Sequence, residues 1–316
     1  MSLFSAARSA CARVAERARF VRIEEVGLEH WVDANCELPQ LASSDPAHRH
    51  FADAETTLAY VVTLDAINFG SGWFPELHKR PGLSGYFTVA SCLREQFERA
   101  GPWSAAELVQ IDARRCADVF EQRANAAVCD LMELFARALR DLGVWLAGRG
   151  GSFARAVEDA GASADRLAAA LAEMPLYRDV ARYADFDVPL YKRAQLTSAD
   201  LAAAFDGRGW GEFRDLGELT IFADNLVPHV LRREGVLAYD ADLAARIERG
   251  ELVPAGSPEE VEIRAVALHA VERAVQALRA RGVDASAQRL DYLLWNRGQR
   301  PEIKAHPRHR TRCPYY

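Results

Sequence analysis

The stretch that decides the fold runs from Ser257 to Gly282 and reads SPEEVEIRAVALHAVERAVQALRARG. Ser257 and Glu260 have the spacing of a capping box, and Pro258 occupies the first helical position. Behind them, apolar residues recur every three or four positions, as on a helix that faces a core. These residues are Val261, Ala265, Leu268, Val271, Val275 and Leu278. Because Gly282 is a typical helix stop, the stretch predicts a long helix with both ends marked.

The same helical period returns in other parts of the chain. Apolar residues between Leu131 and Leu142 follow it, and Gly148 ends that segment. Ser104 begins a second capping box, and Thr197 is predicted to open a short helix.

Alternation of β-branched and polar residues, which is typical of strands, is not sustained anywhere in the sequence. The sequence therefore predicts an all-α protein of about ten packed helices. We expect one compact multi-helix domain over residues 1–316, in which a subdomain break would fall near residues 148–152.

Composition limits the partners of this chain. It has 316 residues, half of them apolar, and a net charge of −6 at pH 7. General binders of DNA or RNA normally carry a basic excess, so stable binding to a nucleic acid is disfavoured. A small anionic ligand held by a few local cations is compatible with this composition.

The cysteines and the hydropathy pattern indicate a cytoplasmic protein. The six cysteines form no C-x-x-C pair, which argues against a disulfide scaffold and against a zinc ribbon. No stretch approaches 18 apolar residues, so no membrane span is expected, and the N-terminus lacks the apolar core of a signal peptide.

Asp65 is the first candidate for chemistry. In a helix over 57–69 it would lie on the apolar stripe with Leu58, Val61 and Val62. A carboxylate on that face must be paired or must line a cavity, because burying it alone is costly. Asn68 follows one turn later. The alternative is a buried structural acid that bonds to an arginine or a helix end.

Asp224 is the second candidate, in the tract Leu219–His229. Pro228 disfavours a continuous helix, so we expect one helix to end near Asp224 and another to start at Pro228. The carboxylate of Asp224 and the amide of Asn225 would lie at this junction. An Asx cap that closes the junction is the simpler interpretation.

Two basic clusters complete the candidates. Lys192 and Arg193 lie between aromatic and amide groups, and they would either face solvent in a basic turn or bind an anion or a carboxylate. The segment 306–316 is rich in arginine and histidine and ends in two tyrosines. Its arginines, including Arg310 and Arg312, match phosphate geometry, and a frayed tail is the alternative.

Metal and cofactor sites are not expected. His48-Arg49-His50 and the group His306, His309 and Cys313 offer donors, but neither has the spacing of a known zinc motif. Gly70-Ser71-Gly72 is not followed by the lysine and hydroxyl residue of a nucleotide-binding loop.

Taken together, these segments resemble the queuosine salvage family, the queuosine 5'-phosphate N-glycosylase/hydrolases. The tracts that carry the resemblance span most of the chain in order: His50-Phe51, Asp65–Phe69, Tyr191–Gln195, Leu219–Asp224, Glu260–Arg264, Asp291–Trp295 and Arg308–Tyr316. One departure is the run Phe69–Phe74, where the family is expected to have a tighter group of aromatic residues.

The resemblance implies an all-helical fold similar to DNA glycosylases. It also implies release of queuine, a 7-deazaguanine base, from queuosine 5'-phosphate. By this resemblance Asp224 is the catalytic carboxylate and Lys192 is its neighbour in the site. Asp224 would stabilise the positive charge on the ribose, attack it as a nucleophile, or activate water, and the sequence leaves these three roles open.

Further roles follow from the expected substrate. Asp65, or alternatively Asp291, would accept the donor edge of the guanine-like base. Three aromatic residues are candidates for stacking on it, namely Phe51, Trp73 and Trp295. The arginine-rich tail would bind the 5'-phosphate.

Two other functions fit the same residues. One is a base-excision glycosylase that acts on a polymer, although the acidic composition argues against it. The other is a non-catalytic module that binds a nucleotide or tRNA in the same pocket.

Overall fold

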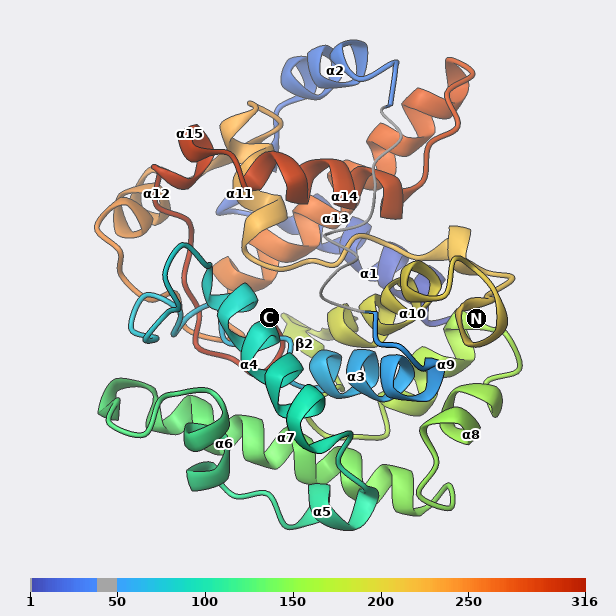
Figure 1. The fold of residues 1–316 in the computed structure, drawn as a ribbon. Helices are drawn as coiled ribbons and strands as arrows, with labels where there is room; N and C mark the ends of the chain where they lie inside the picture. The colour runs from blue at the N-terminus through green and yellow to red at the C-terminus, as the bar shows by residue number, and fades with distance from the viewer. Residues whose placement is uncertain (1, 39–49) are drawn as a thin grey trace. The chain divides into compact units, whose positions relative to one another are not determined.

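A computed structural model describes residues 2–38 and 50–316 of the chain. Most of these residues are helical, as predicted, but two short antiparallel sheets accompany the helices (Figure 1). The sheets were not predicted because each strand has only three or four residues, too few to show a period in the sequence. Within the described ranges, no helix is long and apolar enough to cross a membrane.

The chain divides into two compact units, each assembled from separate segments. Of the described residues, unit 1 comprises 2–38, 179–192 and 217–312, and unit 2 comprises 50–178, 193–216 and 313–316. Residues 148–152 lie inside unit 2.

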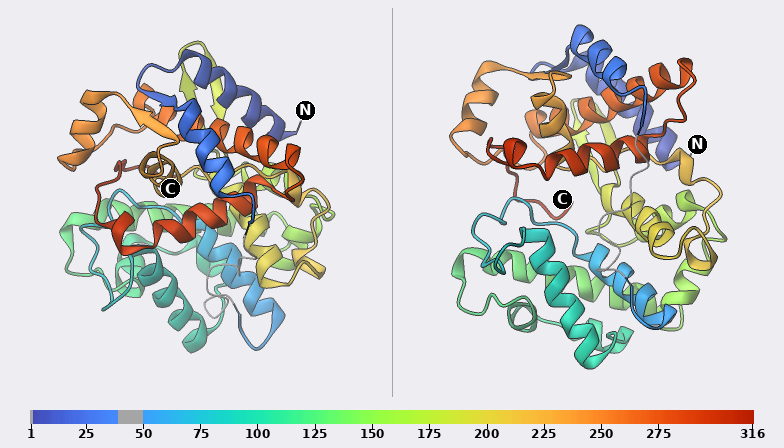
Figure 2. Two further views of the ribbon diagram at one scale, coloured as in Figure 1. Left: turned by 90° about the horizontal axis from the view of Figure 1, so that it is seen from above. Right: turned by 45° about the horizontal axis from the view of Figure 1, so that its top comes forward.

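Unit 1 is organised around the helix that the sequence marks most clearly, α13. Helix α13 contacts α1, α2, α11 and α14 as well as strands β1 and β2, and Figure 2 shows α1 beside it. The elements of this unit are α1 (Leu3–Arg17), β1 (Val21–Ile23), α2 (Glu25–Ala34), β2 (Val180–Tyr183), β3 (Phe186–Pro189), α11 (Leu226–Arg233), β4 (Leu237–Tyr239), α12 (Ala241–Glu248), α13 (Pro258–Ala280), α14 (Ala287–Gly298) and α15 (Pro301–Lys304).

A buried carboxylate on α13 holds the start of β1. Glu262 Oε2 accepts hydrogen bonds from the backbone N–H groups of Arg19, Phe20 and Val21 at 3.0, 2.6 and 3.1 Å, and its Oε1 accepts one from the Tyr183 hydroxyl at 2.7 Å. Strand β1 then pairs with β4, and β2 pairs with β3. These bonds compensate the carboxylate for its burial and hold both short sheets against one helix.

Unit 2 is built on α7, which packs against α3, α5 and α6 (Figure 1). Its elements are α3 (Ala54–Ala66), α4 (Gly85–Ala100), α5 (Ala105–Val109), α6 (Ala113–Val119), a 3-10 turn (Ala126–Val128), α7 (Cys129–Ala147), α8 (Phe153–Glu158), α9 (Ala164–Leu171), α10 (Lys192–Ala204, whose first residue belongs to unit 1) and a second 3-10 turn (Gly209–Gly211). In a third 3-10 turn, Leu216–Glu218, the first residue belongs to unit 2 and the other two to unit 1.

The predicted helix ends are confirmed where a cap marks them. Ser257 Oγ accepts from Glu260 N at 3.3 Å at the start of α13, and Ser104 and Glu107 form a complete capping box on α5. Thr197 was expected to open a helix and does not. Helix α10 begins five residues earlier at Lys192, and the Thr197 hydroxyl donates back to Arg193 O at 3.0 Å inside it.

Candidate active site

The tract that precedes α11 is a buried, non-helical segment of unit 1. Residues 219–223 are each at most 4% exposed, and Asn225 is 2% exposed. Asp224, between them, is half-buried. The expectation that a helix ends near Asp224 is wrong, because residues 219–225 are not helical and α11 begins at Leu226. Pro228 lies in the first turn of α11, where its missing N–H costs nothing.

Asp224 is held by one of its two carboxylate oxygens. Its Oδ1 accepts hydrogen bonds from Leu226 N at 2.7 Å and from Val227 N at 3.0 Å, so it caps α11. These two hydrogen bonds confirm the interpretation of Asp224 as an Asx cap. Its Oδ2 accepts no hydrogen bond from the residues that the structure describes, so one oxygen of a half-buried carboxylate is available for chemistry.

Three neighbours fix the backbone on either side of Asp224. Asp291 Oδ1 accepts from Phe222 N at 2.9 Å, and Arg264 Nε donates to Ala223 O at 2.9 Å. The side-chain amide of Asn225 donates to His309 O at 3.2 Å. Asp291 and Asn225, both predicted as substrate ligands, thus contribute to holding the tract.

Lys192 lies in a tightly held turn of unit 1 at the start of α10. Lys192 is only 6% exposed, so the interpretation of this segment as a solvated basic turn is wrong. Its N–H donates to Asp179 Oδ2 at 3.1 Å, and the preceding residue, Tyr191, has a left-handed backbone with φ of 48°. Such a conformation is strained for a tyrosine and persists only where the surroundings enforce it.

The arginine-rich segment is docked within unit 1 rather than frayed. Val253 N donates to Arg310 O at 2.8 Å, and the Thr311 hydroxyl donates to Val253 O at 2.9 Å. Arg310 and Arg312 are half-buried. Burial lowers the pKa of Arg308, and the charge of Asp224 opposes that shift, which places this guanidinium within electrostatic range of the carboxylate.

Two histidines near this segment are kept neutral. Burial lowers the pKa of His309 to about 3, and the charges of Arg264, Arg308 and His229 add to the effect. Burial also lowers the pKa of His229, on α11, to about 4, although its hydrogen bond to Ile303 O opposes the shift. The positive charges that the structure places at the Asp224 tract are therefore those of Arg264 and Arg308.

The remaining acid, Asp65, belongs to unit 2. It lies in α3, where residues 57–66 are all buried, and it is 0% exposed. Burial raises the pKa of Tyr177, and the charges of Asp65 and Asp200 contribute to the shift, whereas Arg193 opposes it. Asn68 lies beyond the end of α3 and is half-buried, with its N–H directed to Asp65 O at 3.3 Å.

Arg193 acts as a structural clamp in unit 2. Its guanidinium donates to four carbonyl oxygens, those of Asp65, Ala66, Leu176 and Pro314. Its charge also lies 4.8 Å from the ring centre of Phe69 and 4.4 Å from that of Tyr177. These contacts use its hydrogen-bond donors on the protein itself, and the assignment of Arg193 to the substrate stays a prediction.

The predicted stacking residues differ in their surroundings. The Phe51 ring packs 5.1 Å from that of Tyr60, and Trp73 is 3% exposed with its Nε1 donating to Asp130 Oδ2 at 2.9 Å. Trp295, on α14, is half-buried, and His50 is exposed. Phe51 is half-buried as well, so of the three aromatic residues only Trp73 lacks the exposure that a stacking surface needs.

Sequence reasoning missed Asp179 and the role of Arg264. Arg264 lies three residues after Val261 on the apolar stripe of α13, and an arginine on such a stripe indicates a buried partner. Asp179 gives no comparable signal, because it lies outside any periodic segment. His48 and Arg49, in the run whose spacing does not match a zinc motif, lie outside the described residues. Within the described ranges no group of three or more His, Cys, Asp and Glu is placed to hold a metal ion.

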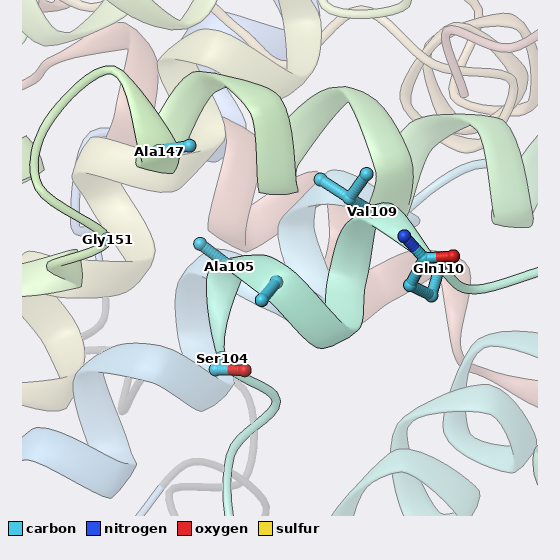
Figure 3. A pocket seen from close by; sticks show the side chains of 7 residues that line it. Ser104, Ala105, Val109, Gln110, Ala147 and Gly151 are labelled. Atoms are coloured by element: carbon cyan, nitrogen blue, oxygen red, sulfur yellow. The ribbon is translucent and has the colours of Figure 1, made fainter.

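A separate hollow of about 520 Å³ lies where α5 meets the end of α7. Figure 3 shows Ala105 and Val109 of α5 opposite Ala147 and Gly151. Its lining is mostly apolar and contains none of the candidate residues named above, so we assign it no part in the chemistry.

Comparison with known proteins gives one consistent result. The family model described as queuosine salvage protein matches residues 47–316. A protein of Sphaerobacter thermophilus named queuosine 5'-phosphate N-glycosylase/hydrolase is 38% identical over 96% of this chain and 95% of its own length. A protein of Mus musculus with the same name is 31% identical over 96% of each chain, and one of Bos taurus is 30% identical over 83% of this chain and 82% of its own length.

Proposed function

The chain belongs to the queuosine salvage protein family, and from this premise we propose that it hydrolyses the N-glycosidic bond of queuosine 5'-phosphate. The products are queuine and ribose 5-phosphate, so the protein is an N-glycosidase that serves queuine salvage. The observation that carries the proposal is the half-buried Asp224, which caps a helix with one oxygen and keeps the other available inside an otherwise buried tract.

The chemistry requires a carboxylate of this kind. Breaking the bond between the ribose C1' and the base nitrogen builds positive charge on the sugar, and water then adds to C1' while a proton goes to the base. A carboxylate that is already fixed in place stabilises that charge without reorganising. The two backbone N–H groups on Oδ1 fix Asp224, and we propose that Oδ2 faces the reacting sugar or the water that adds to it.

Other residues of unit 1 have supporting roles in this proposal. Lys192 supplies positive charge to the site, and Asn225 and Asp291 keep the tract in place. The guanidinium groups of Arg308, Arg310 and Arg312 are candidates for the 5'-phosphate, since arginine matches phosphate geometry. We propose that Trp295 stacks on the base. In unit 2, base recognition by Asp65 stays a prediction.

Several finer expectations also stay predictions. They are a fold similar to DNA glycosylases, a single domain, a cytoplasmic location, a reaction without metal or cofactor, and the lack of a stable nucleic-acid partner. The composition supports the last of these, because the net charge is −6.

A chromatographic assay of base release tests the proposal. Protein treated with EDTA is incubated with queuosine 5'-phosphate, queuosine and guanosine 5'-phosphate in separate reactions. We expect free queuine from the first substrate and much less base from the other two. Asp224→Asn should abolish release, since the amide keeps the capping oxygen and removes the charge. Binding of all three compounds without any base release would contradict the hydrolase and favour a non-catalytic nucleotide-binding module.

A further inference from the structure

A buried ion pair links two separate segments of unit 1. Arg264, on α13, donates through Nη1 to Asp179 Oδ1 at 3.0 Å and through Nη2 to Asp179 Oδ2 at 2.5 Å. The two side chains are 1% and 3% exposed. Glu260 Oε1, one turn earlier on α13, lies 3.5 Å from Arg264 Nη1 and balances its charge further. Two parallel bonds of this kind fix the guanidinium in its plane.

The arginine end of the pair reaches the catalytic carboxylate through the backbone. A third donor, Nε of Arg264, donates to Ala223 O at 2.9 Å. Ala223 directly precedes Asp224, so the position of α13 determines where this part of the backbone lies. Because the tract is not helical, its carbonyl groups have no partners in a regular element, and a side chain must hold them.

The aspartate end of the pair holds the turn that presents Lys192. Asp179 O accepts from Leu190 N at 2.9 Å and from Tyr191 N at 3.1 Å, and Asp179 Oδ2 accepts from Lys192 N at 3.1 Å. These bonds enclose Tyr191, whose left-handed backbone would relax to an ordinary conformation without them. The ion pair is therefore the common support of the backbone around Lys192 and Asp224.

We propose that Arg264 is a positioning residue, which, through Asp179, holds Lys192 and Asp224 in the one arrangement that releases the base. The proposal rests on the function proposed above. A lysine in its place would keep the charge but lacks the planar fork and the separate Nε donor, so it cannot hold Asp179 and Ala223 together. Arg264 acts through the two site residues and touches no substrate itself.

The first experiment measures kcat and KM for base release in Arg264→Lys and in Asp179→Glu. The latter keeps the ion pair but lengthens one side chain by a methylene. Arg297→Lys is the matched control, because Arg297 also joins separate segments of unit 1, through Glu234 at 2.9 Å and through Asn35. Thermal unfolding is recorded for every variant.

Both site variants should lose about 10- to 100-fold in kcat, with KM within about threefold of wild type, because displaced catalytic groups slow chemistry more than binding. Arg297→Lys should keep kcat and lower the melting temperature less than Arg264→Lys does, because the side chains of its ion pair are 20% and 22% exposed. If both site variants fold and keep kcat within about twofold, the proposal is wrong. If Arg264→Lys does not fold, Asp179→Glu decides the question alone.

A second measurement separates positioning from a general loss of structure. Arg264→Lys is repeated in an Asp224→Glu protein, where the carboxylate is already displaced. A positioning role predicts a further loss below about threefold, whereas a purely structural role predicts the same loss in both proteins. A wild-type protein that releases no base overturns the proposed function and this role with it. An active wild type with active variants overturns the positioning role alone.

Discussion

Two helices of unit 1, α11 and α12, each start beside an aspartate that accepts from the N–H groups two and three residues further on, and they lie in different surroundings. Asp224 Oδ1 accepts from Leu226 N at 2.7 Å and from Val227 N at 3.0 Å. Asp240, the N-cap of α12, likewise accepts through Oδ1 from the N–H groups two and three residues further on, Asp242 N at 3.0 Å and Leu243 N at 3.2 Å. Both aspartates are half-buried.

The difference lies in what each helix packs against. In α11 every residue from Leu226 to Leu231 is buried, and a buried tract precedes it. In α12 only Leu243 and Ile247 are buried, so it is a surface helix. The comparison teaches that capping and catalysis are compatible roles for one carboxylate. The same cap geometry becomes a candidate site only where its surroundings exclude water and bring other charged groups near.

The largest expected effect sets the two caps against each other directly. Asp224→Asn and Asp240→Asn each keep the capping oxygen and remove one negative charge. We expect Asp224→Asn to lose about 10²- to 10³-fold or more in kcat, the range typical for loss of an electrostatic catalytic group, with a nearly unchanged melting temperature. Asp240→Asn should keep both. The measurements are base release and thermal unfolding of the two variants side by side.

Equal activity of the two variants would contradict the claim that Asp224 is catalytic and Asp240 is not. It would leave Asp224 as a structural residue and move the search for the catalytic carboxylate to other acids, with Asp65 first among them.

Acid should affect the α11 region through His229, whereas α12 contains no histidine. Burial lowers the pKa of His229 from 6.5 to about 4. The unfolded chain therefore binds a proton more readily than the folded one, so stability is fully present above pH 6.5 and decreases as the pH falls toward 4. Between pH 7 and 4.5 this histidine alone should remove about 2 kcal/mol from the free energy of unfolding.

Urea unfolding of wild type and His229→Gln at these two pH values measures the effect. Glutamine still offers an N–H to Ile303 O and does not titrate, so its loss of stability on acidification should be smaller by that amount. An identical loss in both proteins would show that His229 does not contribute to the pH dependence.

The smallest effect concerns the surface cap. Asp240→Ala removes both hydrogen bonds at the start of α12 and should lower the free energy of unfolding by about 1 kcal/mol. Base release should stay at the wild-type rate. Chemical denaturation together with the kinetic assay checks both statements, and a large loss of activity would mean that α12 supports the site.

Helices with strong local signals could be predicted from the sequence. The Ser257 cap, the proline that follows it and the apolar period of α13 act within one helix, so their effects are visible in a few residues. Helix α10 was placed too late because Lys192 follows a strained Tyr191 whose conformation depends on Asp179, which is distant in sequence.

The candidate site was predictable as residues but not as geometry. The resemblance selected Asp224 and Lys192 and the segment that contains Arg264. It could not indicate that Arg264 donates to Ala223 O, or that the guanidinium of Arg193 donates to backbone carbonyl oxygens. These hydrogen bonds join segments far apart in the chain. Such contacts depend on tertiary packing, which single-sequence patterns do not report.

The clamp formed by Arg193 has a consequence for synthesis of the protein on the ribosome. One of its carbonyl partners belongs to Pro314, and residues 313–316 are part of unit 2. The guanidinium, 1% exposed in the folded protein, cannot obtain its full set of bonds until those residues have been translated. Unit 2 should therefore remain incomplete until residues 313–316 have been translated, long after the residues of helices α3 to α10.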